Sequence, residues 1–225
     1  DNGLPLDTVI VGPDGTWTYT PPPLNEGEHS LTLIVTDPAG NASEPSDPYT
    51  IIVDTTAPLT KAIIESITKD SGSNTGDFLT HDGSAGRLIS GSLSAALMTD
   101  EKVQVSLDGG NTWVDAIITG PNSWSFVDSN SHAADWDIQT RVVDQAGNVG
   151  VVETQHVTLD TTAPEAPASV NRSGDDVTVD LTGTQAQVGD TVFVTVGGQQ
   201  FSHGLTQGEI DAGSVVVTVP TTTTG

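Results

Sequence analysis

One segment occurs twice in this chain, and that repeat limits the folds open to it more than any other feature. The copies are VTDPAGNASEPSDPYTIIVDTTAP, from Val35 to Pro58, and VVDQAGNVGVVETQHVTLDTTAP, from Val142 to Pro164. Each copy is typical of a strand, a tight turn at Asp-x-Ala-Gly-Asn and a returning strand. An extended linker follows, because the residue before a proline disfavours helical conformation. The pattern predicts the closing hairpin of a repeated domain.

The period of the repeat sets the size of that domain. The two DTTAP ends begin at Asp54 and Asp160, 106 residues apart. About 100 residues is the size of an immunoglobulin-like sandwich. We therefore expect an all-β protein of tandem immunoglobulin-like β-sandwiches in an elongated rod. The expected domains are the end of a first repeat with its linker (1–58), a complete middle repeat with its linker (59–164) and the start of a third repeat (165–225).

Alternating apolar and polar residues predict the strands. The first repeat gives strands near 8–11, 16–20 and 30–36, and the third near 177–182, 191–196 and 215–219. Seven are expected in the middle repeat, near 61–67, 87–94, 102–107, 112–118, 123–127, 137–143 and 149–159. Ser94 to Met98 is the best, though weak, helical candidate. Trp17 and Trp124 occupy equivalent strands after Gly-Pro turns, and both are expected in a core between two sheets.

Composition excludes several classes of partner. Thirty Asp and Glu side chains stand against six Lys and Arg, giving a formal net charge of −24. Such a surface repels nucleic acid and anionic lipid and requires cations. Cysteine is absent, so metal ions rather than disulfides are the expected cross-links. No run of eighteen apolar residues or basic-then-apolar start is present, so we expect neither a membrane span nor a signal peptide in this sequence.

The densest group of loop carboxylates lies between Lys69 and Gly83, in KDSGSNTGDFLTHDG. This acidic loop contains Asp70, Asp77 and Asp82. Calcium prefers six to eight oxygen ligands, and glycines let a backbone fold around it. The loop therefore predicts a calcium site. The alternative is a solvated loop with acidic turn residues.

The repeated aspartates suggest a second site, at the linkers. In a seven-strand sandwich the last hairpin turn lies at the pole where the chain enters. Asp144 of the middle repeat should therefore face the linker that begins at Asp54, and one cation is expected between them, with Asn148 nearby. Asp160 begins the next such linker, and Asp37 is the equivalent of Asp144 in the first repeat. The alternative for Asp37 and Asp144 is conformational, since an Asp that opens a turn accepts hydrogen bonds from its amides.

Motifs for catalysis are few. The segment from Ser106 to Trp113 (SLDGGNTW) fits the Asp-box of sialidases. A single copy indicates only a hairpin turn, and six basic residues cannot supply the arginine cluster with which a sialidase binds a carboxylate. The five histidines show no zinc-ligand spacing, and no nucleophile elbow, P-loop or Rossmann fingerprint occurs. An enzyme is not expected, although a glycosidase accessory region is one alternative. Another is a carbohydrate-binding array in which exposed Trp113 or Trp136 stacks on a sugar.

With these motifs the chain resembles tandem bacterial immunoglobulin-like repeats of giant type I-secreted adhesins from Gram-negative bacteria. The resemblance covers all 225 residues and rests on D-x-A-G-N, DTTAP and the acidic loop. It implies calcium at and near domain junctions, bound mainly by aspartates. Carried over residue by residue, the ligands are Asp37 and Asp144 of the turns, Asp54 and Asp160 of the linkers, and Asp70, Asp77 and Asp82 of the loop.

The same resemblance implies a function. The chain is expected to be a calcium-stiffened stalk on the bacterial cell surface, whose parent protein contacts host-cell glycans through other regions. Its direct partners are expected to be neighbouring repeats of the same chain, with no nucleic acid and no membrane insertion. In the third repeat, NRSGDD from Asn171 to Asp176 is much shorter than the acidic loop, so a full loop site is not expected there.

Overall fold

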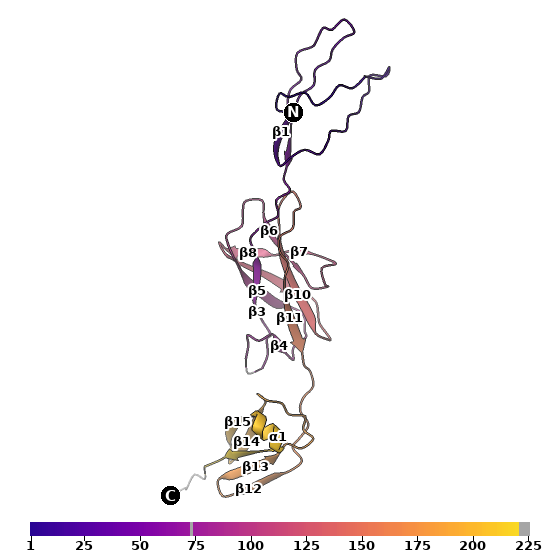
Figure 1. The fold of residues 1–225 in the computed structure, drawn as a ribbon. Helices are drawn as coiled ribbons and strands as arrows, with labels where there is room; N and C mark the ends of the chain where they lie inside the picture. Colours follow the sequence, from indigo (N-terminus) through magenta and orange to yellow (C-terminus); the bar gives the residue numbers. More distant parts are fainter. Residues whose placement is uncertain (73, 221–225) are drawn as a thin grey trace. The chain divides into compact units, whose positions relative to one another are not determined.

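A computed structural model describes residues 1–72 and 74–220. The chain forms two compact units, Asp1–Asp160 and Thr161–Gly225, and each is described by itself. Strands dominate both units, as expected for an all-β protein (Figure 1). Within the described residues, no helix has the length and apolar character that crossing a bilayer requires.

The first repeat contains little regular structure. Strand β1 (Gly27–Leu31) pairs antiparallel with β2 (Tyr49–Val53), so that Gly27 faces Val53. The expected strands at 8–11 and 16–20 are wrong, because these residues form turns and irregular chain. The strand expected at 30–36 begins earlier, at Gly27, and ends at Leu31. A stable strand needs a hydrogen-bonded neighbour, and no strand of the described residues pairs with residues 8–20.

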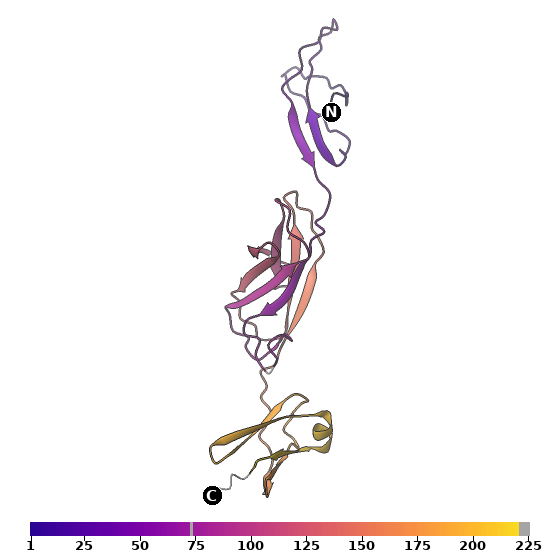
Figure 2. The same cartoon turned by 90° about the vertical axis from the view of Figure 1, so that its left-hand side faces the viewer.

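The middle repeat is a sandwich of two sheets. One sheet has the order β3-β5-β9-β8 and the other β4-β11-β10-β6-β7. The first contains β3 (Ala62–Ile67), β5 (Arg87–Leu93), β8 (Ile117–Gly120) and β9 (Ser123–Asp128). The second contains β4 (Leu79–Thr80), β6 (Lys102–Ser106), β7 (Val114–Asp115), β10 (Trp136–Val143) and β11 (Glu153–Leu159). The sheets lie face to face (Figure 2).

Most of the strands expected in this repeat are present, although the one expected at 149–159 begins only at Glu153. Two further differences are larger. The strand expected at 112–118 is divided at Ala116, so that β7 pairs with β6 in one sheet and β8 with β9 in the other. The strand β4 pairs parallel with β11 and was not expected, because two residues are too short to show a pattern. The weak helical candidate at Ser94 to Met98 is wrong, since no helix forms there.

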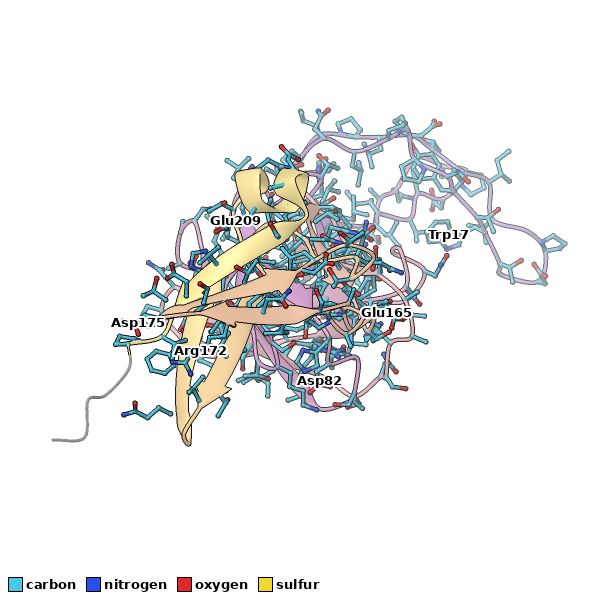
Figure 3. All side chains as sticks on the ribbon, turned by 90° about the horizontal axis from the view of Figure 1, so that it is seen from below. Trp17, Asp82, Glu165, Arg172, Asp175 and Glu209 are labelled. Atoms are coloured by element: carbon cyan, nitrogen blue, oxygen red, sulfur yellow. The ribbon has the colours of Figure 1, made fainter. Side chains whose placement is uncertain are left out.

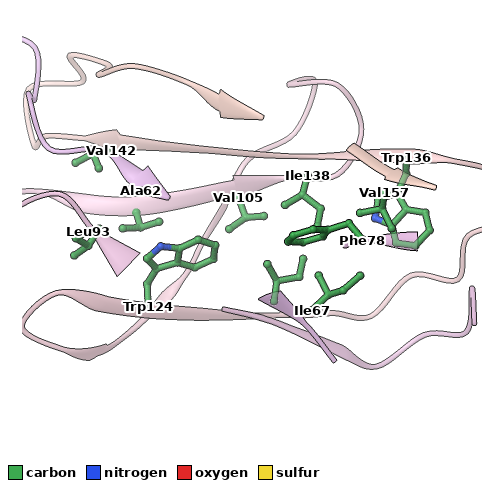
Figure 4. Packing of buried hydrophobic residues seen from close by; sticks show 12 residues of the cluster. Ala62, Ile67, Phe78, Leu93, Val105, Trp124, Trp136, Ile138, Val142 and Val157 are labelled. Carbon is green, nitrogen blue, oxygen red and sulfur yellow. The ribbon is translucent and has the colours of Figure 1, made fainter. Parts of the chain in front are cut away.

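Trp124 lies in the core of the sandwich, where 1% of its surface is exposed (Figure 4). Its indole nitrogen donates a hydrogen bond to the carbonyl oxygen of Ser92, at 3.1 Å. Gly91 lies directly opposite on β5, and a Cβ there would approach the Trp124 ring to 2.7 Å. The expectation that this tryptophan is a core residue is therefore confirmed, and Gly91 provides the room for its ring.

The unit from Thr161 to Gly225 has a core of its own. It contains β12 (Val170–Ser173), β13 (Asp176–Asp180) and β16 (Ser214–Thr218) in one sheet, and β14 (Thr191–Val196) paired with β15 (Gln199–Gly204). The helix α1 (Gln207–Ala212) was not expected. Its signal is the capping sequence Thr206-x-x-Glu209, in which the Glu209 carboxylate accepts a hydrogen bond from the Thr206 amide.

Candidate functional site

The two D-x-A-G-N turns share one hydrogen-bonding pattern. In the middle repeat, Oδ1 of Asp144 accepts hydrogen bonds from the amides of Gly147 and Asn148, and Oδ2 accepts one from the Asn148 side chain, each at 2.8 Å. In the first repeat, Asp37 accepts the equivalent bonds from the amide and the side chain of Asn41. Both aspartates therefore cap their own turns, as the conformational interpretation predicts.

The surroundings of the two turns differ. Asp144 is 8% exposed and therefore buried, whereas Asp37 is exposed. Burial raises the pKa of Asp144, but the hydrogen bonds from Asn148 and Gly147 outweigh it and leave the pKa below its ordinary value. The pKa of Asp37 is lowered mainly by the hydrogen bonds from Asn41, with smaller contributions from the amides of Ala39 and Gly40. Both carboxylates therefore remain charged at neutral pH.

The turn of the middle repeat contacts the linker that enters it. The side-chain amide of Asn148 donates a hydrogen bond to the carbonyl oxygen of Asp54, at 3.1 Å. The same nitrogen donates to Asp144, so one amide joins the linker to the turn. Gly150 lies against the linker as well, because a Cβ there would approach the carbonyl oxygen of Pro58 to 2.7 Å.

Glu26 holds the same linker from the first repeat. Its carboxylate accepts a hydrogen bond from the amide of Thr55 at 2.8 Å, another from the Thr55 hydroxyl, and one from the Thr56 hydroxyl at 3.2 Å. These bonds lower the pKa of Glu26. No sequence motif indicates this role of Glu26, since a single Glu before a strand is not distinctive. The linker is thus fixed at both of its sides.

The structure therefore brings Asp54 and Asp144 to one junction, as the topology predicted. They are joined through the amide of Asn148, and the Asp54 carboxylate accepts a hydrogen bond from the amide of Thr56, at 3.0 Å. The amide nitrogen occupies a position between the Asp54 carbonyl oxygen and the Asp144 carboxylate. A cation shared by Asp54 and Asp144 stays a prediction.

Asp70 is the most unusual carboxylate of the acidic loop. It is 7% exposed, and its Oδ2 accepts a hydrogen bond from the amide of Phe78, at 3.2 Å. Its Oδ1 is buried and has no hydrogen-bond partner among the described residues. Lys69 and Phe78 both have positive φ, 64° and 61°, which costs bulky residues energy and is common at functional sites. An unsatisfied buried oxygen in a strained loop suits a cation ligand.

The other acidic-loop carboxylates cap local turns. Asp77 accepts a hydrogen bond from the amide of Leu79, at 3.1 Å, and Asp82 accepts one from the amide of Ser84, at 2.8 Å. The hydrogen bonds from Ser84 lower the pKa of Asp82. No group of three or more His, Asp or Glu side chains in residues 1–72 and 74–220 has an arrangement that holds a metal ion. A single ion bound by all three loop aspartates stays a prediction.

The acidic loop lies beside the exit linker. The amide of Asp160 donates a hydrogen bond to the carbonyl oxygen of Thr80, at 2.9 Å, and β4 pairs with the end of β11. Asp160 is therefore near the loop that contains Asp70.

A buried charge cluster supports the same loop. Arg87 is fully buried, and its guanidinium donates to Asp128 at 2.6 Å and to the carbonyl oxygens of Asp82 and Ser84 at 3.1 and 2.9 Å. The Asp128 carboxylate also lies 2.8 Å from Nε2 of His132. This cluster is not evident from the sequence, because 41 residues separate Arg87 from Asp128 and no motif links them.

Trp136 is not a sugar-stacking platform, which corrects the expectation of an exposed ring. It is 7% exposed, because His132 stacks on it with ring centroids 4.1 Å apart and the Arg87 guanidinium lies 4.5 Å from its centroid. Trp136 begins β10, whose alternation turns this side chain inward. Its sequence neighbours are polar, which concealed that burial.

The Asp-box segment is a hairpin turn, as expected. Asp108 accepts hydrogen bonds from the amide of Thr112 at 2.9 Å and from the hydroxyl of Ser106 at 2.8 Å. The hydrogen bonds from Thr112 and Ser106 lower the pKa of Asp108 to about 2. The indole of Trp113 donates to the carbonyl oxygen of Gly110 at 2.9 Å and is covered by Arg141, whose guanidinium lies 4.0 Å from the ring centroid. These contacts stabilise the hairpin turn.

Comparison with solved structures gives distant likenesses only. The sulfane dehydrogenase SoxCD from Paracoccus pantotrophus is 23% identical, with a TM-score of 0.28, and the match covers 52% of this chain and 27% of that protein. The chicken CNTN1 FN1-FN3 domains are 15% identical, with a TM-score of 0.34, and the match covers 86% of this chain and 66% of that one. Neither likeness bears on the function of this chain.

Comparison with protein families is more informative. No curated protein matches the sequence. The family model described as bacterial Ig-like domain matches residues 3–55 and 58–161, which is more than half of the chain. The two matches meet at the linker that Glu26 and Asn148 hold. On this match, the chain belongs to the bacterial Ig-like domain family.

Proposed function

We propose that this chain is a calcium-stiffened stalk segment of a giant adhesin on the surface of a Gram-negative bacterium. The observation that carries the proposal is the linker between the two family matches, which is hydrogen-bonded on one side to Glu26 and on the other to Asn148. A linker fixed in this way limits hinge motion, and a stalk needs that property. Bacterial Ig-like domains are also typical of extracellular or surface-exposed proteins.

The held linker gives each repeat a defined attachment to its neighbour. Flexible connections between domains allow relative motion unless specific contacts prevent it. Here the Thr55 amide and the Asp54 carbonyl, which are adjacent backbone groups, bond to different repeats. Pro58 is buried and adds a fixed backbone angle. The partners of this segment are accordingly neighbouring repeats of the same chain.

Calcium fits the acidic loop through Asp70. Its buried Oδ1, which has no hydrogen-bond partner within residues 1–72 and 74–220, is a hard oxygen donor, which calcium prefers. Asp70, Asp77 and Asp82 would hold the ion in the loop, and the linker aspartates Asp54 and Asp160 would hold ions at the junctions. A bound calcium supplies positive charge that compensates the buried carboxylate and part of the formal charge of −24.

In this proposal the segment supports adhesion without binding the receptor. Contact with host-cell glycans belongs to other regions of the parent protein, because the two tryptophans considered as sugar platforms, Trp113 and Trp136, are engaged within the middle repeat. The segment lies outside the cell, and the type I secretion route follows from the resemblance of its motifs.

Calcium titration of the whole chain after removal of metal by a chelator tests the proposal. We expect calorimetry to show calcium binding, and we expect Asp70→Asn to lower the number of bound ions by at least one. Asp47→Asn, an exposed carboxylate outside the motifs, is the matched control and should keep the wild-type number. Scattering should show a larger maximum dimension with calcium than with the chelator. An unchanged ion number in Asp70→Asn, together with an unchanged dimension, would contradict the proposal.

A further inference from the structure

The outer face of the sheet β3-β5-β9-β8 in the middle repeat is uncharged over most of its area. Alternation turns every second side chain of these strands away from the core, because Arg87, Ile89 and Trp124 point inward and are buried. We call the outward side chains of this sheet the neutral face: Ile63, Ser66, Leu88, Ser90, Ser92, Ile117, Ser123, Ser125 and Val127. The one exposed carboxylate of these four strands, Glu65, lies at the bulge of the edge strand β3.

The strand register brings the side chains of the neutral face into rows. Ser90 lies opposite Ser66 on one side and opposite Ser125 on the other. The hydroxyl groups of Ser66 and Ser90 share a hydrogen bond of 2.9 Å. Another of 2.9 Å runs from the Thr119 hydroxyl to that of Ser123. A hydroxyl that is bonded within its own sheet loses little when water is removed, so this face is covered at a low cost in polar desolvation.

The other sheet of the middle repeat has a charged outer face. Its outward side chains include those of Lys102, Asp115, Asp137, Arg141 and His156. Acidic side chains occur in both units of the chain, as Figure 3 shows for Asp82, Glu165, Asp175 and Glu209. With a formal net charge of −24, two copies repel each other wherever acidic surfaces meet. Within the middle repeat, this repulsion is smallest at the neutral face.

The sequence of the first repeat contains the same uncharged row. The middle repeat has SWSFV from Ser123 to Val127, and the first repeat has TWTYT from Thr16 to Thr20. In both segments the second and fourth residues are aromatic. The first, third and fifth residues, which face outward in β9, carry hydroxyl or methyl groups and no charge. The uncharged row therefore recurs with the repeat.

We propose that the neutral face is the surface on which a second copy of this chain packs, side by side with the first. A cationic partner is attracted to the acidic surfaces, whereas a second copy is itself acidic and approaches best where neither side carries charge. The inference rests on the proposed function, because stalks anchored on one cell surface run in the same direction. Two such copies are related by a two-fold axis parallel to the strands, so each row meets the same row of the second copy.

The size of the neutral face sets the strength of this pairing. Strands about 4.8 Å apart, with a rise of about 3.3 Å per residue, give the face an area of about 400 Å². Pairing therefore buries about 800 Å² in total, which is below the roughly 1,200 Å² of stable complexes. A single contact is weak, and a stalk with several repeats adds such contacts along its length. The experiment must accordingly trap a short-lived pair.

Cysteine cross-linking traps the pair, because the chain has no cysteine of its own. The single-cysteine variants Ser123→Cys and Val127→Cys place a thiol at either end of β9 on the neutral face. With a short bis-maleimide and excess calcium, we expect each variant to form covalent dimers at least fivefold faster than Thr154→Cys. Thr154 is the matched control, since it is exposed on the outer face of the other sheet. Ser123 is less exposed than Thr154, so access to the thiol does not explain a faster reaction.

Mixing the two face variants tests the direction of the copies. A size-tagged Ser123→Cys chain and an untagged Val127→Cys chain should give fewer mixed dimers than random pairing gives, because equal rows meet when the copies run in the same direction. In the opposite direction, the row of Ser123 meets the row of Val127, and mixed dimers exceed the random proportion.

A charge in the middle of the neutral face tests the contact itself. Ser90→Asp, added to the Ser123→Cys chain, should slow its cross-linking at least fivefold, because the pairing then brings two like charges together. Gln139→Glu is the matched control, since it adds the same charge to the outer face of β10. It should leave the rate unchanged. Equal thermal midpoints for the two variants show that both are folded.

Four results would overturn the proposal. Equal rates for Thr154→Cys and the face variants would show no preference for the neutral face, and an unchanged rate with Ser90→Asp would place the contact elsewhere. An excess of mixed dimers would give copies that run in opposite directions. Protection of Ser123→Cys by dextran, without dimers, would make a neutral polysaccharide the occupant. None of these results changes the number of calcium ions bound, so failure of the pairing is distinguishable from failure of the proposed stalk.

Discussion

The first and middle repeats share the same closing segment, yet only the middle repeat has a core. Both contain a D-x-A-G-N turn capped by its own aspartate, and both end in DTTAP. The turn geometry is the same in the two places because it depends on hydrogen bonds within five residues. The burial of Trp17 and Trp124 differs because it depends on strands far away in the chain. The comparison separates local from long-range determinants of structure.

The largest expected effect comes from the paired tryptophans. Trp124→Ala should lower the free energy of unfolding of the middle repeat by about 3–5 kcal/mol, because it leaves a cavity beside Gly91. Trp17→Ala should change it by less than about 0.5 kcal/mol, because that ring is partly in water. Urea unfolding of both variants measures the difference. Equal losses would show that Trp17 is packed as Trp124 is.

A similarly large loss of unfolding free energy is expected when the buried ion pair between Arg87 and Asp128 is broken. Asp128→Ala leaves the fully buried Arg87 without its partner and should cost about 3–5 kcal/mol in unfolding free energy. Pro21→Ala, at the equivalent position of the first repeat, should cost less than about 0.5 kcal/mol. Thermal unfolding at fixed salt checks both. A small loss in Asp128→Ala would mean that water reaches the Arg87 guanidinium.

The paired asparagines give an intermediate effect. Asn148→Ala removes the hydrogen bonds to Asp144 and to the Asp54 carbonyl and should lower the unfolding free energy by about 1–2 kcal/mol. Asn41→Ala removes only the bond within its exposed turn and should cost less than about 1 kcal/mol. Hydrogen exchange at Thr55 and Thr56 should accelerate in Asn148→Ala and not in Asn41→Ala. Unchanged exchange in Asn148→Ala would show that Glu26 holds the linker alone.

The smallest effect concerns pH and the Asp-box hairpin of the middle repeat. The pKa of Asp108 is about 2 when folded and about 4 when unfolded. Its contribution to stability is therefore complete above about pH 4 and is lost as the pH falls toward 2. The pKa of His156 is raised by Asp137, so its contribution is complete below about pH 6.5 and is lost as the pH rises through the folded value.

Unfolding midpoints across pH test these two residues. Asp108→Asn should flatten the loss of stability between about pH 4 and 2, and His156→Gln should flatten the small loss above about pH 6.5. Asp37 gives the comparison in the first repeat, because its pKa is also lowered and its turn is exposed. Asp37→Asn should leave the midpoint of the middle repeat unchanged at every pH. A shift in that variant would show coupling between the two repeats.

For the proposed calcium site, too, the sequence and the structure give different information. The sequence predicted Asp70, Asp77 and Asp82 as ligands from their number and spacing. The structure distinguishes them, because Asp70 is buried with an oxygen that has no partner among the described residues, whereas Asp77 and Asp82 cap exposed turns. Spacing alone does not show burial. In the folded loop, Phe78 enters the core and its amide donates a hydrogen bond to Asp70. The supporting roles of Glu26 and Arg87 likewise arise from contacts across 29 and 41 residues.

The sequence by itself determined the all-β class, the repeat period, most strands of the middle repeat and the turns that Asp37, Asp108 and Asp144 cap. These features depend on alternation and on hydrogen bonds between near neighbours, which a linear pattern records. Only the tertiary structure decided that Trp136 is buried, that Arg87 pairs with Asp128 and that Asn148 reaches Asp54. These three contacts depend on which strands, distant in the sequence, pack against each other. That arrangement exists only in the folded chain.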